Sequence, residues 1–262
     1  MADLRPETTA AVAEVRAALS LAAQGTGGVH AKVGRDVVTD TDIAVEDRLR
    51  QSLTDASLWP VIGEERGGKV PTNTPYWVVD PICGTRNFAS GIPLFSINVA
   101  LIEDGQVAAS VVGDGSTGDV LVAEAGKGAR RVRADQQSLL AASDSSSIVD
   151  FGAWPKAGPD RDRAAQSLAA AIAADRWDVR CFSTTLSLAL VATGQVAACV
   201  LFAAPDVVHI AAGTLLVAEA GGQVTDTSGE PWTLGARSLV CSADERFHQS
   251  VLGLLGTGLP PR

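Results

Sequence analysis

The sequence predicts a mixed protein in two halves, the first of α+β type and the second built from α/β layers. In the first half, two helical segments precede apolar strands that are separated by the hairpin signals "EDG" and "DGSTGD". In the second half, strand-like and helix-like segments alternate, which favours α/β layers around a largely parallel sheet. The boundary is expected near "AASDSSS", at residues 141–147, so that the halves are residues 1–142 and 143–262.

The first half is expected to begin with two helices. Residues 7–23 alternate Ala, Val and Leu with charged residues, which is typical of an amphipathic helix. Residues 39–53 predict the second helix, with Thr41 or Asp42 as its N-cap. Short runs rich in β-branched and aromatic residues then predict strands at 58–65, 76–81, 96–102, 107–113 and 119–126.

The second half repeats a strand-then-helix pattern. Its apolar, β-branched runs predict strands at 145–152, 177–183, 196–203, 223–226 and 238–243. The intervening segments are rich in Ala and Leu, and they predict helices at 160–174, 184–194, 206–222 and 245–255. We find no internal repeat and no low-complexity linker.

The composition is that of a globular protein with a sizeable core. Hydrophobic residues make up 46% of the 262 residues and charged residues 19%, which excludes a disordered chain. No apolar run approaches the ~20 residues that a membrane-spanning helix needs. The N-terminal segment also lacks the charged-then-apolar layout of a signal peptide. We therefore expect a cytoplasmic protein without a membrane partner.

Charge and cysteine content exclude further classes. The formal net charge is −9, and the only basic cluster is "ARRVR" at 129–133, which argues against a nucleic-acid partner. No two cysteines form a C-x-x-C pair, so a disulfide framework or a structural zinc site is not expected. The cysteines are Cys83, Cys181, Cys199 and Cys241.

Three acidic clusters stand at the ends of predicted elements. They are "DVVTDTD" (36–42), "GEE" (63–65) and "DP" (80–81), and the last is followed by "CGTRN". Taken singly, each cluster is more often a solvated turn or a helix cap. Together, converging carboxylates and the Thr85 hydroxyl offer the oxygen ligands that Mg²⁺ requires. The clusters therefore predict a site for a divalent cation.

These segments carry a resemblance to a known family. "DPICGTRNF", "GEE", the spacing from Lys32 to Asp42 in "KVGRDVVTDTD", and "VHIAAGTLLVAEAGG" occur in order over about residues 7–250. In this respect the chain resembles the inositol monophosphatase superfamily of Mg²⁺-dependent phosphatases. The resemblance implies a layered α-β-α-β-α sandwich of the inositol monophosphatase and fructose-1,6-bisphosphatase type, with a site between the two halves.

The resemblance also implies roles for individual residues. Thr85 and Asp42 would orient the water that attacks phosphorus, and the amides of Gly84 and Thr85 would hold phosphate oxygens. A second cation would stabilise the leaving oxygen. The ligands implied for the first metal are Glu64, Asp80, the Ile82 carbonyl and Thr85.

The second metal site departs from the family pattern. The family uses three carboxylates there, of which this chain keeps only Asp80. Cys83 and His209 stand at the positions of the other two. Because Mg²⁺ strongly prefers oxygen ligands, a thiol and an imidazole should weaken its binding at this second position.

Three explanations of this departure stay open. The enzyme works with the first metal alone, or with Asp206, itself a natural helix N-cap, replacing the lost ligand. Alternatively, Cys83 and His209 join Asp80 in binding a softer ion, so that Mg²⁺ is accompanied by Mn²⁺, Zn²⁺ or Fe²⁺. In the third, the chain is a silent ligand-binding relative, or uses Cys83 as nucleophile and His209 as base. Both residues also fit an ordinary core role, as a buried thiol and a hydrogen-bonded histidine.

The substrate contact differs as well. Where inositol-hydrolysing relatives place an acidic residue against sugar hydroxyls, this chain has Phe202. An apolar wall leaves hydroxyls unpaired, so a substrate with an aromatic or apolar part is expected. The overall prediction is a metal-dependent phosphomonoester hydrolase for a small phosphorylated metabolite, namely a sugar, cyclitol or nucleoside phosphate, in specialised metabolism. Relatives are often homodimers, although no pattern in this chain marks an interface.

Overall fold

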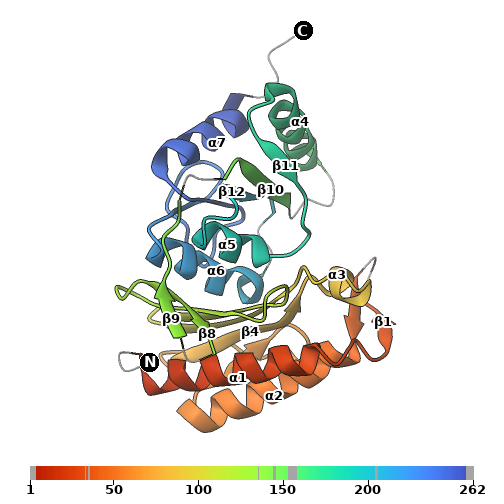
Figure 1. The fold of residues 1–262 in the computed structure, drawn as a ribbon, viewed down its shortest axis with the longest axis vertical. Coiled ribbons are helices and arrows are strands. Elements are labelled where there is room, and N and C mark those ends of the chain that lie inside the picture. The colour runs from red at the N-terminus through yellow and green to blue at the C-terminus, as the bar shows by residue number, and fades with distance from the viewer. Residues whose placement is uncertain are drawn as a thin grey trace.

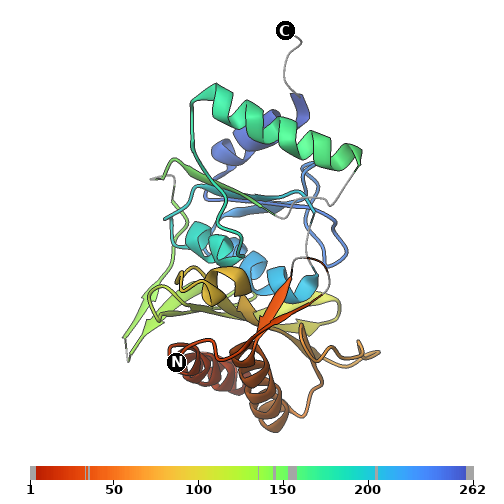
Figure 2. The same ribbon diagram turned by 90° about the vertical axis from the view of Figure 1, so that its right-hand side faces the viewer.

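The protein is built from five stacked layers. The computed structural model describes residues 4–32, 34, 36–134, 136–143, 146–152, 158–203 and 206–257. From one end to the other, a helix pair, a seven-stranded sheet, a second helix pair, a five-stranded sheet and a third helix pair follow each other (Figure 1). The view turned by 90° shows the same order (Figure 2). The predicted α-β-α-β-α sandwich is therefore confirmed.

The helices fill three of these layers. The first pair is α1 (Pro6–Ala22) and α2 (Asp40–Ser57), the middle pair is α5 (Leu186–Ala192) and α6 (Val207–Glu219), and the last is α4 (Pro159–Ala174) and α7 (Glu245–Thr257). A short helix, α3 (Thr85–Ala89), lies at the edge of the large sheet. Among the described residues, no helix is both long and apolar enough to cross a membrane.

The seven-stranded sheet runs in the order β3-β4-β5-β6-β7-β8-β9. Its strands are β3 (Val61–Gly63), β4 (Tyr76–Cys83), β5 (Ser96–Glu103), β6 (Gln106–Asp114), β7 (Val120–Glu124), β8 (Ala129–Arg133) and β9 (Gln136–Leu139). All neighbours pair antiparallel except β3 and β4. The predicted meander is therefore present, and it continues through one further hairpin, β8–β9, that the sequence pattern did not indicate.

The five-stranded sheet is mixed, which corrects the expectation of a largely parallel sheet. Its order is β11-β10-β12-β14-β13, and only β10 pairs parallel with its neighbours, β11 and β12. The strands are β10 (Ile148–Gly152), β11 (Asp178–Arg180), β12 (Ala198–Leu201), β13 (Gln223–Thr225) and β14 (Leu239–Ser242). The last strand enters between β12 and β13 and pairs antiparallel with both. Strand periodicity carries no information about such an insertion.

The start of α2 also differs from the prediction. Thr39, and not Thr41 or Asp42, is the N-cap, and Asp42 is the third helical residue. The Thr39 side chain accepts the Asp42 amide while the Asp42 carboxylate accepts the Thr39 amide, which is a capping box. Thr39 also closes a hairpin of β1 (Val29–Ala31) and β2 (Val37–Thr39). The acidic run "DVVTDTD" therefore comprises strand β2 and the first turn of α2.

A single apolar layer connects the two sheets. Side chains of the large sheet, of α5 and α6, and of the small sheet form one buried cluster, which includes Val78, Ile102, Leu188, Ile210 and Leu239. Gly213 of α6 permits this packing, because a Cβ there would lie 2.6 Å from Leu188 side-chain atoms. The division after residue 142 falls between the last strand of one sheet and the first of the other, and as a domain boundary it stays a prediction.

His248 of α7 provides a pH-dependent contribution to stability. It is buried, and its two ring nitrogens each lie 2.8 Å from a hydroxyl, of Thr225 and Ser242. Burial lowers the pKa of His248 from 6.5, although Glu245 opposes this. Because the unfolded chain then binds the proton more readily, stability should fall as the pH drops through the unfolded pKa of 6.5.

We expect this loss of stability to appear when the wild type is compared with a variant that lacks the His248 imidazole. The unfolding midpoint of the wild type should fall more than that of His248→Gln between about pH 7.5 and about pH 5.5. The comparison is needed because His209, described below, has a raised pKa and acts in the opposite direction. Parallel pH curves for the two proteins would contradict the assignment.

Candidate active site

Strand β4 delivers three of the predicted site residues to one end of the large sheet. Asp80, Ile82 and Cys83 are buried, because α2 and α6 pack on opposite faces of this strand. The pairing of β4 with β5 changes register between Asp80 and Cys83. Gly84 follows with φ of +102°, and a Cβ there would lie 2.9 Å from atoms of two neighbouring segments. Only glycine satisfies both requirements, and α3 begins directly after it at Thr85.

Asp42 and Thr85, predicted to act as a pair, are in contact. The Oδ1 atom of Asp42 lies 3.1 Å from Thr85 Oγ1, which is also 3.0 Å from the Ile82 carbonyl oxygen. The Oδ2 atom of Asp42 accepts the Thr39 amide at 3.0 Å. Burial raises the pKa of Asp42, while the hydrogen bonds from Thr39 and Thr85 act against that rise. The capping box therefore fixes the carboxylate at the start of α2, and the contact with Thr85 joins α2 to the start of α3.

Glu64 stands in the loop after β3, beside Lys32. The Lys32 Nζ lies 3.1 Å from Glu64 Oε1 and 2.6 Å from Glu65 Oε1. Burial, and then the negative charge of Asp80, raises the pKa of Glu64 to about 8. Two buried carboxylates that repel each other mark a position where a cation would be stabilised.

The buried carboxylate of Asp80 shows that a cation fits this site. Its side chain is fully buried, with one oxygen 2.7 Å from His209 Nδ1. Its other oxygen, Oδ1, has no hydrogen-bond partner among the described residues. A buried carboxylate oxygen without a partner is costly unless a ligand satisfies it. Glu64, Asp80, the Ile82 carbonyl and Thr85 offer the hard oxygen atoms that Mg²⁺ prefers, so this donor set fits the first cation.

Cys83 and His209 lie together with Asp80 in a second cluster. One potential ligand atom from each residue lies within 4.8 Å of the others. Burial opposes a charge on His209, but the Asp80 carboxylate outweighs burial and raises its pKa. Burial, and next the charge of Asp80, raises the pKa of the Cys83 thiol. The cluster offers one oxygen, one sulfur and one nitrogen, a donor set suited to softer ions than Mg²⁺.

The sequence did not reveal how this cluster is supported. The Thr185 hydroxyl lies 2.9 Å from both Cys83 Sγ and the His209 carbonyl oxygen, and the Thr185 amide lies 3.3 Å from the same sulfur. The Asn98 side-chain amide lies 3.1 Å from the Thr185 hydroxyl and 3.2 Å from the His209 carbonyl. The neighbouring Thr184 hydroxyl donates to the Cys83 carbonyl at 2.8 Å. No local pattern marks these residues, because every contact joins segments distant in sequence.

Two further predicted residues lie apart from the cluster. Phe202 follows β12 and is half-buried, with its ring stacked on Phe151 at 6.0 Å between centroids. Asp206 occupies the N-cap position of α6, where its side chain is exposed and makes no capping hydrogen bond. Asp206 is not part of the Asp80–Cys83–His209 cluster.

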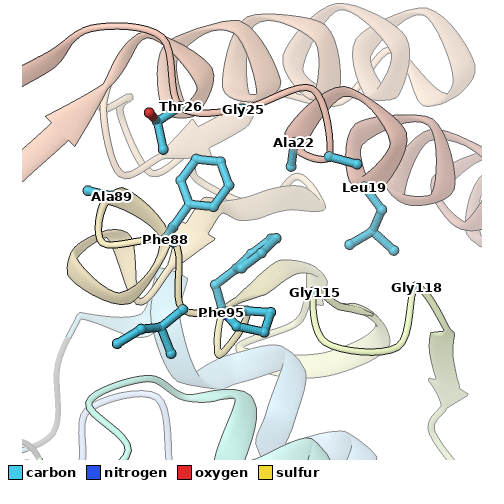
Figure 3. Close-up of a pocket in the computed structure, with 13 residues that line it drawn as sticks. Leu19, Ala22, Gly25, Thr26, Phe88, Ala89, Phe95, Gly115 and Gly118 are labelled. Carbon is cyan, nitrogen blue, oxygen red and sulfur yellow. The ribbon is translucent and has the colours of Figure 1, made fainter.

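An apolar cavity of about 610 Å³ lies on another side of α3 (Figure 3). Phe88 and Phe95 pack edge to face beside it, and the end of α1 closes it through Leu19 and Ala22. None of its lining side chains carries a charge. It therefore lacks the groups that would hold a phosphate, and it is distinct from the acidic site.

Comparison with known proteins agrees with this geometry. The chain matches the model of the inositol monophosphatase family over residues 3–257. A probable inositol 1-monophosphatase, ImpA, from Mycobacterium tuberculosis is 32% identical over 254 residues, which cover 96% of this chain and 93% of the relative. A histidinol-phosphatase from the same organism is 33% identical over 232 residues, covering 84% of this chain and 85% of the relative.

Solved structures show the same fold. The extragenic suppressor protein SuhB from Bartonella henselae superposes with a TM-score of 0.86 at 24% identity, covering 97% of this chain and all of the other. An inositol monophosphatase from Thermotoga maritima superposes with a TM-score of 0.80 at 25% identity, covering 93% and 94%. The chain belongs to the inositol monophosphatase family, a family of phosphatases that generally depend on Mg²⁺.

Proposed function

We propose that this protein hydrolyses the phosphomonoester of a small phosphorylated metabolite with the help of divalent cations. The observation that carries the proposal is the unpartnered, buried oxygen of Asp80 beside the acid Glu64. Both features are unfavourable in the protein alone, and a bound cation would satisfy both. Its family membership supports the same reaction class.

Glu64, Asp80, the Ile82 carbonyl and Thr85 would hold a Mg²⁺ ion. When bound, such an ion supplies positive charge against the phosphoryl oxygens and the developing charge on the leaving oxygen. Asp42 has the complementary role of holding Thr85 Oγ1 in place through Oδ1, at 3.1 Å. In that arrangement Asp42 and Thr85 orient the attacking water, and the Asp42 carboxylate can receive a proton from it. The amides of Gly84 and Thr85 would then hold phosphate oxygens.

The second cation position would take a softer ion. Asp80, Cys83 and His209 fit Zn²⁺ or Fe²⁺, and less closely Mn²⁺, better than they fit Mg²⁺. The Thr185 amide, which donates to the Cys83 sulfur, supports this assignment, as does the Thr185 hydroxyl, whose proton is shared between that sulfur and the His209 carbonyl. Hydrogen bonds of this kind hold a thiolate ligand in position. By contrast, a buried thiol with a raised pKa is a poor nucleophile, so we do not propose covalent catalysis by Cys83.

The proposed substrate has an apolar or aromatic part. This follows from the sequence position of Phe202, which replaces the acidic residue that the family resemblance implies against sugar hydroxyls and would give an apolar wall there. In the structure its ring stacks on Phe151, in an apolar cluster shared with α4 and α7. Each hydroxyl left unpaired against such a wall costs about 1–3 kcal/mol. Nucleoside and aryl phosphates should therefore be hydrolysed faster than inositol phosphate.

The test is phosphate release from a panel of esters with four cations. Inositol, sugar, nucleoside and aryl phosphates should each be incubated with Mg²⁺, Mn²⁺, Zn²⁺ and Fe²⁺. The cations should be tested singly and as mixtures of Mg²⁺ with one softer ion. We expect phosphate release to be faster with such a mixture than with Mg²⁺ alone. The double variant Cys83→Asp/His209→Asp should shift the preference toward Mg²⁺ by about tenfold or more, because it restores oxygen ligands.

Each contrary result has a defined meaning. Highest activity with Mg²⁺ alone, and an unchanged cation preference in the double variant, would refute the soft-metal assignment but leave the hydrolase. A clear preference for inositol phosphate would refute the apolar substrate class. A folded wild type that releases no phosphate from any ester with any cation would refute the proposed reaction.

A further inference from the structure

One face of α2 carries three polar residues at helical spacing. Asp42, Glu46 and Arg50 are four positions apart, so their side chains lie along the same side of the helix. Asp42 contacts Thr85, as described above. Glu46 is fully buried, and Arg50 is its ion-pair partner at 3.0 Å. A fully buried carboxylate is rare unless it is paired, and this one is paired with Arg50.

The Glu46 carboxylate binds the backbone on the C-terminal side of Glu64. Its Oε2 accepts the Glu65 amide at 2.7 Å, and its Oε1 accepts the Arg66 amide at 2.9 Å. On the other side of Glu64 the loop packs directly on this carboxylate, since a Cβ added to Gly63 would lie 1.9 Å from Glu46 Oε1. The carboxylate therefore fixes the backbone before and after the proposed metal ligand.

Arg50 completes the contact from the same helix face. Its guanidinium donates to the Val61 carbonyl and, at 2.8 Å, to the Gly67 carbonyl. These residues stand at the two ends of the segment that contains Glu64, and the Gly63 amide also donates to Gly67 at 3.0 Å. The segment is thus held at its ends by Arg50 and at its centre by Glu46.

We infer that Glu46 is the positioning residue for Glu64, and that α2 aligns the metal ligand with the water-orienting pair. The helix is rigid over the single turn from Asp42 to Glu46, so it sets the distance between the Thr85 hydroxyl and the Glu64 loop. Glu46 itself donates no atom to the reaction; it acts through the two amides. This inference rests on the proposed function, because it assumes that Glu64 binds a cation.

The test measures Mn²⁺ binding to the full-length chain. Binding is detected as the loss of the free-ion signal in electron paramagnetic resonance. Glu46→Gln keeps the size of the side chain but removes its charge and replaces one acceptor by a donor. We expect it to weaken Mn²⁺ binding by about tenfold or more, as loss of a residue that orients a metal ligand typically does. Saturating Mn²⁺ should restore most of kcat, which a general loss of structure would not allow.

A matched control comes from the next residue. Asp47 is exposed and binds the Arg66 guanidinium at 2.7 and 2.9 Å, and within the described part of the chain its carboxylate accepts no hydrogen bond from the loop backbone. Asp47→Asn should therefore bind Mn²⁺ as the wild type does. Gly63→Ala offers a second route, since its methyl group would overlap the Glu46 carboxylate and push it and the loop apart without altering residue 46. It should weaken Mn²⁺ binding as well.

The outcomes separate this inference from the proposed function. A wild type that binds no Mn²⁺ would refute the metal site itself. Equal Mn²⁺ affinity in the wild type and Glu46→Gln would overturn the positioning role alone. If neither variant folds, hydrogen exchange in the wild type decides: slow exchange at the Glu65 and Arg66 amides supports the contact, and exchange at the rate of an open loop overturns it.

Discussion

Asp80→Asn should reduce phosphate release by roughly 10³-fold or more, because Asp80 is a proposed ligand of both cation positions. The neutral amide keeps the shape of the side chain but loses the charge that binds a cation. It also breaks the 2.7 Å ion pair with His209. Activity should be measured at saturating substrate over a wide range of Mg²⁺ and Mn²⁺ concentrations, where excess cation should fail to rescue the variant.

The control for this prediction must exclude unfolding, since removing one partner of a buried ion pair costs about 3–5 kcal/mol. Asp114→Asn is a matched variant: Asp114 is a buried carboxylate of the same sheet, bonded to Ser116 and Thr117. It should lose stability but keep its rate per folded molecule. A folded Asp80→Asn protein with the wild-type rate would remove the basis for the metal site.

Asp42→Asn should lower kcat by about 10²–10⁴-fold, the range expected when a group that accepts a proton in the transition state is removed. The Asn amide can present either an oxygen or an NH₂ group to Thr85 Oγ1, but it cannot take up a proton. KM should change far less than kcat, because Asp42 contacts Thr85 and not the proposed phosphate-binding amides.

The same substitution also weakens the capping box of α2, at a cost of about 1 kcal/mol. Thermal unfolding therefore has to be recorded beside the kinetics. Asp40→Asn is the control, because Asp40 stands in the same helical turn but is exposed, and among the described residues its carboxylate binds His30 and the Gly28 amide and not Thr85. An Asp42→Asn enzyme with unchanged kcat would show that water is oriented by some other group.

The sequence predicted those helices and strands in which apolar residues recur regularly over most of the element's length. The helix at Pro6–Ala22 and the strands from β4 to β7 were predicted within a few residues for this reason. The strand β9, in contrast, is exposed throughout, so no alternation of apolar and polar residues marks it. The position of β14 depends on which strands it meets in space, and a pattern within one segment cannot contain that information.

The candidate site divides in the same way. The family resemblance implied that Asp42 and Thr85 act together, and the structure brings them into contact, although their catalytic role stays a prediction. Thr185, Asn98 and Glu46 were missed, because hydroxyl, amide and carboxylate side chains of this kind are common on any surface. Their significance comes from burial and from partners far along the chain, which only the folded structure reveals.

The apolar layer that α5 and α6 share with both sheets has a consequence for the history of this chain. If recombination joined either half to a different partner, its side of this apolar layer would be exposed unless the new partner had a complementary apolar surface. Change of specificity is therefore expected to proceed through substitutions around the rim of the site, within a scaffold that is inherited whole.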